Sequence, residues 1–237
     1  MAQTRTGAAR RAFGELAVIV VGVLVALWID AAYQAWQDRQ AEQDALRSLS
    51  AELEETLRRL DEAIEVQEEV VAAHRELFQL GESQSLPSQD SLGLLVGRAF
   101  YFARLEPVRG TYDALIASGE ITLLRDHELR DALARLFGFL GDGFEDEAMA
   151  DMGRVQMGNA IAEVAAPIAM IGSQNRSIMG LPPIERPLPF REVLQSPSYL
   201  AALQTVAFPE RGVLESYFQP LRRSLVDVLQ RLGAPGQ

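Results

Sequence analysis

The segment RDHELRD, residues 125–131, gathers the side chains best suited to proton transfer. His127 lies among Asp126, Glu128 and Asp131, types from which a general acid and a general base could be drawn. A simpler interpretation accounts for them, because aspartate is a common helix cap and acids are favoured in the first turn of a helix. We therefore expect a helix to begin here, without catalysis.

The segment GDGFEDE, residues 141–147, comes nearest to a calcium loop. It lacks the full alternating ligand spacing and the terminal glutamate of such a loop, so we expect a turn and an acidic first helical turn. The sequence has no HExxH metal motif, Gly-rich phosphate loop or GxSxG elbow. We predict that the protein is not an enzyme and that it has no metal site and no cofactor.

The composition excludes further chemistries. Cysteine is absent and the 22 basic residues are all arginine, which excludes thiolate nucleophiles, disulfides and Schiff-base lysines. The net charge is −11 and the arginines are dispersed, so we expect no nucleic acid partner. The 237 residues, 48% of them hydrophobic, suffice for a packed core.

The stretch GELAVIVVGVLVALWID, residues 14–30, contains the first candidate functional residues and belongs to a predicted membrane helix. Residues 12–36 are predicted to form a transmembrane helix, with Trp28, Tyr33 and Trp36 as an aromatic belt at its outer end. Residues 1–11 carry three arginines and no acid, so the positive-inside rule places them in the cytoplasm. Residues 37–237 would then lie on the far side of the membrane, outside the cytoplasm. A signal peptide and a buried soluble helix are the alternatives.

The two acids that bound this stretch suggest a packing face. Fifteen residues at about 1.5 Å each place Glu15 and Asp30 about 22 Å apart, less than the ~30 Å of hydrocarbon. Gly22 and Ala26 share their side of the helix and form a small-xxx-small pair. Small residues allow another helix to approach, and acids at this depth usually face protein or water. Alternatively, both acids simply mark the interfaces.

Apolar residues recur at helical spacing after the span. Leu46, Leu53 and Leu60 form one row, and a second row consists of Leu57, Ile64, Val71 and Phe78. These rows predict one long amphipathic helix that ends at Gly81, with a homo-oligomer through residues 46–78 as an option. His74 falls on this seam, where we expect a core histidine with one satisfied nitrogen.

The rest of the chain predicts further helices and no strands. Residues 92–105 and 144–171 are expected to be helical, and a core face is expected at Leu129, Leu133, Leu136, Phe137 and Leu140. Two helices should close the chain, one begun by Ser196 and Pro197 and the other by Pro209, with a kink at Pro220. The fold class is therefore all-α: a membrane helix that leads into an extracytoplasmic helical bundle.

Residues 173–189 form the longest stretch that cannot be regular helix, because they contain Pro182, Pro183, Pro187 and Pro189. We consider this loop a candidate docking or crossover segment, since long irregular connections often carry binding residues.

Two motifs resemble an uncharacterised family of bacterial single-span membrane proteins. The first is the Gly-Glu-plus-apolar span with Gly22, Val23 and Leu24 at its centre. The second is a Thr-Tyr-x-x-Leu-x-x-Ser-Gly segment, found here at residues 111–119. The resemblance covers about the first 140 residues and departs after the span, where Ala35 precedes Trp36 in place of asparagine. It implies a topology and no activity.

These observations favour a non-catalytic accessory subunit. Its span would pack against integral membrane subunits of a larger complex, for example a respiratory or photosynthetic one, and its helical domain would brace the outer face. The alternative is a membrane-anchored helical domain that binds or senses a ligand.

Overall fold

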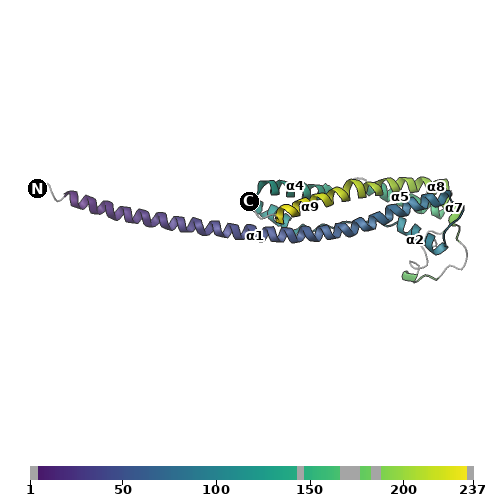
Figure 1. Ribbon diagram of the computed structural model, residues 1–237, viewed down its shortest axis with the longest axis horizontal. Helices are drawn as coiled ribbons and strands as arrows, with labels where there is room; N and C mark the ends of the chain where they lie inside the picture. The colour runs from purple at the N-terminus through teal and green to yellow at the C-terminus, as the bar shows by residue number, and fades with distance from the viewer. Residues whose placement is uncertain (1–4, 143–146, 166–176, 183–187, 234–237) are drawn as a thin grey trace. The chain divides into compact units, whose positions relative to one another are not determined.

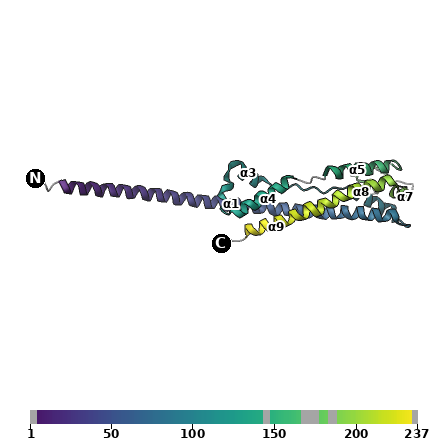
Figure 2. The ribbon, with the colours of Figure 1, turned by 90° about the horizontal axis from the view of Figure 1, so that it is seen from above.

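The computed structural model describes residues 5–142, 147–165, 177–182 and 188–233, and at residues 5–19, 142, 147 and 148 it describes the backbone alone. Every regular element in these ranges is helical (Figures 1 and 2), which confirms the all-α class. The helices are α1 (Arg5–Glu82), α2 (Gln89–Ala99), α3 (Gly110–Ser118), η1 (Glu120–Leu123), α4 (His127–Asp142), α5 (Glu147–Ala162), α7 (Phe190–Leu194), α8 (Pro197–Gly212), η3 (Val213–Phe218) and α9 (Gln219–Gly233).

The chain divides into two compact units, and α1 contributes to both. Unit 1 contains residues 1–51 and 110–127, and unit 2 contains residues 52–109 and 128–237. In unit 1, the loop after η1 is fastened to α1 by Arg125. Its backbone N–H donates to one carboxylate oxygen of Glu42 at 2.7 Å, and its guanidinium lies 3.4 Å from the other.

The helix predicted up to Gly81 is confirmed, since α1 ends at Glu82, but half of its predicted seam is wrong. Leu53 and Leu60 are fully buried. The second buried row consists of Thr56, Ala63, Val70 and Leu77, one residue before the expected row of Leu57, Ile64, Val71 and Phe78, which is only half-buried. The more apolar row therefore lies beside the true seam.

Helix α2 is shorter than the hydrophobic pattern predicted. It ends at Ala99, and residues 101–109 are not helical. This stretch runs back along α1: the Arg59 guanidinium donates to the carbonyl oxygen of Glu106 at 3.1 Å, and the N–H of Val108 donates to Thr56 Oγ1 at 3.0 Å. These two bonds fix the chain against α1, an arrangement that local apolarity did not reveal.

Helices α5 and α8 pack closely and antiparallel. A Cβ built on Gly153 would lie 2.9 Å from the backbone of Val206, and Ser198 donates to a Glu163 carboxylate oxygen at 2.8 Å. A helix was expected over residues 144–171, and α5 runs from Glu147 to Ala162. Residues 163–165 are not helical, and residues 144–146 and 166–171 lie outside the described part of the chain. Of its methionines, Met157 is buried, whereas Met149 and Met152 are largely exposed.

The last helices differ from the prediction at two prolines. Ser196 caps α8 and Pro197 opens it, as expected, but Pro209 lies inside α8 and starts no new helix. A π-helical segment, η3, follows, and Pro220 is the second residue of α9. The prolines Pro209 and Pro220 flank this stretch of wider turns.

Figures 1 and 2 show α8 and α9 beside the later part of α1. An ion pair joins α9 to α1 there, between Arg222 and Asp61 at 2.7 Å.

The predicted core face of α4 is confirmed, because Leu129, Leu133, Leu136, Phe137 and Leu140 are all buried. A further core cluster joins the end of α1 to α2, α5, α7 and α8, with Leu77, Val96, Ile161 and Tyr199 among its buried members. From Leu53 to Leu77 the seam of α1 is thus buried within unit 2, and a homo-oligomer through residues 46–78 stays a prediction.

Candidate functional site

The predicted packing face is exposed wherever the structure describes it. Gly22, Ala26 and Asp30 lie on the first part of α1, and every described residue from Val20 to Asp30 is exposed within the chain. The side chain of Glu15 is outside the described residues. Nothing lies within 4 Å of the Cβ position of Gly22, so its small size is not required by any described contact within the chain.

The predicted aromatic belt is exposed as well. Trp28 is 73% exposed, and Tyr33 and Trp36 stack with their ring centroids 6.0 Å apart. The amide of Gln34 donates to Asp30 at 3.0 Å, which partly satisfies this carboxylate from its own helix. Large exposed aromatic rings next to a ~20-residue apolar stretch are typical of a helix that meets a membrane interface. None of the most apolar window of α1 is buried within the chain.

The candidate docking loop is described in part. Pro182 and Pro189 lie in non-helical backbone, and Pro189 directly precedes α7. Pro183 and Pro187 lie outside the described residues. Docking by this loop stays a prediction.

The acidic segment around His127 begins a helix, as expected. Helix α4 starts at His127, and the Glu128 carboxylate pairs with Arg231 of α9 at 3.4 Å. Most of GDGFEDE lies outside the described residues. Among the described side chains, no group of three or more His, Asp or Glu residues is placed to hold a metal ion.

A buried polar junction, formed by Gln67, Arg154 and Glu210, was missed by sequence reasoning. Glu210 of α8 is completely buried. The Gln67 amide donates to its carboxylate at 2.6 Å and to its backbone carbonyl at 2.8 Å. The Arg154 guanidinium also donates to the Glu210 carboxylate, and it lies 4.8 Å from the ring centroid of Phe102. The junction therefore ties together α1, the non-helical residues 101–109, α5 and α8.

The electrostatics of the junction are dominated by burial. Burial raises the pKa of the Glu210 carboxyl, while Gln67 and Arg154 partly counteract that rise. Carboxyls with raised pKa values occur at active sites. Glu210, however, has no exposed surface, and it lines neither the cleft between α4 and α9 nor the cleft beside α1 and α2. The junction positions four segments and presents no open surface to a substrate.

His74 is the core histidine that the seam predicted. Its Nε2 lies 3.0 Å from the carbonyl oxygen of Ala99, and Nδ1 has no hydrogen-bond partner among the described atoms. Because a carbonyl only accepts, Nε2 must carry the proton. Burial lowers the pKa of His74 to about 4, the bond to Ala99 opposes this shift, and the positive charge of Arg154 adds to it.

One feature of the sequence, the heptad spacing, indicated that polar residues would be buried along the seam of α1. Thr56, Gln67 and His74 recur at heptad positions with Leu53 and Leu60, and buried polar residues at such positions commonly fix register. Their partners are 25 to 143 residues distant in the sequence, so the pattern alone could not identify them. In comparisons with known proteins, the chain matches no family model, no curated protein and no solved structure.

Proposed function

We propose that the chain is a single-span membrane protein that acts as a non-catalytic accessory subunit. The first part of α1 packs against an integral membrane partner, with Gly22, Ala26 and Asp30 on the contact face. The helical bundle lies on the outer side of a bacterial inner membrane and braces that complex. Residues 1–11 are cytoplasmic in this arrangement.

The observation that carries the proposal is the open space at Gly22. A glycine inside a helix costs about 1 kcal/mol relative to alanine, and no described contact within the chain requires it. The residues around it are apolar and exposed, so they call for an apolar environment supplied from outside. Close approach of a second membrane helix satisfies both features.

The span interpretation has a further support in the exposure of this stretch. A core helix of a soluble protein would bury its apolar residues, yet Val21, Leu24 and Leu27 are each more than half exposed. A cleaved signal peptide would require a break after the apolar run, whereas α1 continues as one helix to Glu82.

Gly22→Leu and Ala26→Leu test the contact face. The matched control is Ala31→Leu, which makes the same enlargement on nearly the opposite side of the helix. Each protein is tagged at its carboxyl terminus, produced at native level, extracted in mild detergent and sized. We expect a large particle for the natural chain and for the control, and a smaller one for both face variants.

Two results would contradict the proposal. One is that the natural chain elutes alone, and the other is that all four proteins elute in the same large particle. Resistance of the membrane fraction to alkaline washing shows whether each variant is still inserted, so a failure of insertion is not mistaken for a loss of partner.

A further inference from the structure

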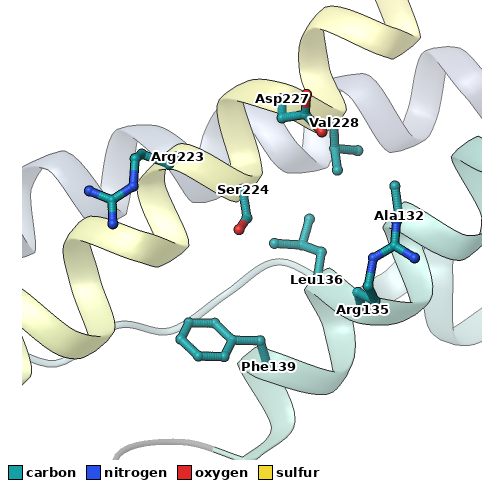
Figure 3. Close-up of a pocket in the computed structure, with 8 residues that line it drawn as sticks. All are labelled: Ala132, Arg135, Leu136, Phe139, Arg223, Ser224, Asp227 and Val228. Carbon is teal, nitrogen blue, oxygen red and sulfur yellow. The ribbon is translucent and has the colours of Figure 1, made fainter.

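A cleft between α4 and α9 has an apolar floor. Its volume is about 430 Å³, near the lower end of the ~300–1,000 Å³ typical of small-molecule pockets. Figure 3 shows Leu136 and Phe139 of α4 facing Ser224 and Val228 of α9. Leu136 and Val228 are buried, whereas Phe139 is half-buried and packs against Tyr217 with ring centroids 5.2 Å apart.

Two arginines form the rim of this cleft. Figure 3 shows Arg135 and Arg223 at opposite ends, with the floor between them. The acid on the same rim, Asp227, is held by Arg231 at 3.1 Å. The cleft therefore carries two cationic side chains and one anionic side chain that is already paired.

The rim arginines differ from most of the arginines in this chain. Within the described part of the protein, most arginine side chains have an ion pair, a hydrogen bond or a ring contact, as Arg58, Arg154 and Arg222 do. Those for which the described residues supply no such partner are Arg39, Arg75, Arg135 and Arg223. Two of these four line one cleft, in a chain whose net charge is −11.

This combination selects one class of ligand. A guanidinium presents a planar fork of N–H donors that matches a carboxylate. Two guanidiniums without an acidic partner among the described residues raise the local potential for an anion. The floor offers leucine, valine and an aromatic ring, which favour an apolar body. Ser224 can donate one more hydrogen bond from between the arginines.

We propose that the cleft between α4 and α9 binds a small amphipathic carboxylate. Its carboxylate is held by Arg135 at one end of the rim, and its apolar body lies over Leu136 and Phe139. Arg223, at the other end, adds to the positive potential of the cleft. The site is distinct from the membrane face and does not depend on the accessory role, so either can fail without the other.

Calorimetric titration of the full chain in lipid nanodiscs tests this site, with 4-phenylbutyrate as the probe and empty nanodiscs as the blank. We expect saturable binding that weakens at least tenfold in the double variant Arg135→Gln/Arg223→Gln. The matched control is Arg75→Gln, which removes an equally unpartnered arginine from α1 and should bind as the natural chain does. Glutamine keeps a polar side chain without the positive charge, and an unchanged unfolding midpoint verifies the fold of each variant.

Three outcomes would overturn the proposal. The first is heat that does not saturate or that the double variant leaves unchanged. The second is equal binding of 4-phenylbutylamine, which has the same body and the opposite charge. The third is inorganic phosphate binding as tightly as 4-phenylbutyrate, which would make the rim a simple anion site.

Discussion

Two stretches of α1 place opposite kinds of side chain in opposite surroundings. From Val20 to Asp30, every residue of a nearly all-apolar stretch is exposed within the chain, whereas between Leu53 and Leu77 the buried seam includes Thr56, Gln67 and His74. One helix therefore has apolar residues without a partner at one end and polar residues with specific partners at the other.

The contrast shows that the apolar character of a residue in α1 does not by itself decide whether it is buried within the chain. Exposed apolar residues in quantity point to an environment that the chain does not supply, such as lipid or another protein. Buried polar residues are tolerated where they make hydrogen bonds, and Thr56, Gln67 and His74 each make at least one, with Val108, Glu210 and Ala99 respectively. The first stretch depends on the surroundings of the molecule, and the second depends on its tertiary structure.

The largest effect should come from removing the cation of the polar junction. Arg154→Met leaves the carboxylate of Glu210 buried without its guanidinium, and breaking such a pair typically costs about 3–5 kcal/mol. We expect the free energy of unfolding, measured by urea denaturation in mild detergent, to fall by about that amount.

The matched control replaces both partners. In Arg154→Met/Glu210→Leu no charge remains to be buried, so most of the lost stability should return. If Arg154→Met alone costs less than about 1 kcal/mol, in the range of an exposed pair, water reaches Glu210 and the junction is not closed.

The second effect is a loss of folding stability at acidic pH. His74 has a pKa of about 4 in the folded chain and about 6.5 when unfolded, so the folded state favours the neutral ring. Its contribution is complete above about pH 6.5 and is lost as the pH falls toward 4, by on the order of 3 kcal/mol in total. Unfolding free energies at pH 7.5 and 4.5 measure this loss.

His74→Gln supplies the reference for the acid effect. Glutamine can donate to the carbonyl of Ala99 but does not titrate, and the carboxylates titrate in both proteins, including Glu210, whose raised pKa acts in the opposite direction. The natural chain should therefore lose more stability than the variant between the two pH values. Equal losses would show that His74 is hydrated when folded.

These features also show which parts of the fold could be predicted from the sequence. The periodicity of Leu53 and Leu60, and the face that runs from Leu129 to Leu140, predicted helices and burial correctly, because helical spacing alone decides which residues share a side. The prediction of the second seam row failed, since Thr56 and Ala63, which are buried, are less apolar than Leu57 and Ile64, which were expected there. Burial there depends on partners that only the tertiary structure brings near.

Of the candidate sites, one could be predicted from the sequence and two could not. The face at Gly22 could be proposed from spacing, because a membrane helix is defined by its own residues. The junction at Glu210 and the cleft at Arg135 each join helices that are distant in sequence. No local pattern around Pro209 or in the arginine-rich α9 indicated either of them.

A third and smaller effect compares the same substitution at two glycines inside helices. In Gly153→Ala the new Cβ would lie 2.9 Å from the backbone of Val206, and backbone cannot yield as a flexible side chain does. Strain from overpacking, at about 1–3 kcal/mol, should exceed the ~1 kcal/mol gained in helix propensity. We expect a net loss of about 1 kcal/mol in unfolding free energy, and a gain would show that α5 can move away from α8.

The smallest effect on the fold should come from Gly22→Ala, which completes the comparison. Apart from the adjacent residues and backbone of α1 itself, no described atom lies within 4 Å of the added methyl group, so the unfolding free energy of the bundle should change by less than about 0.5 kcal/mol. The same methyl group would hold a neighbouring membrane helix farther away, so the proportion of protein in the large detergent-extracted particle should fall. Ala31→Ser, a small change on the other side, should leave that proportion unaltered. If Gly22→Ala destabilises the bundle instead, the glycine packs against this chain, and the reason for assigning its face to a partner is lost.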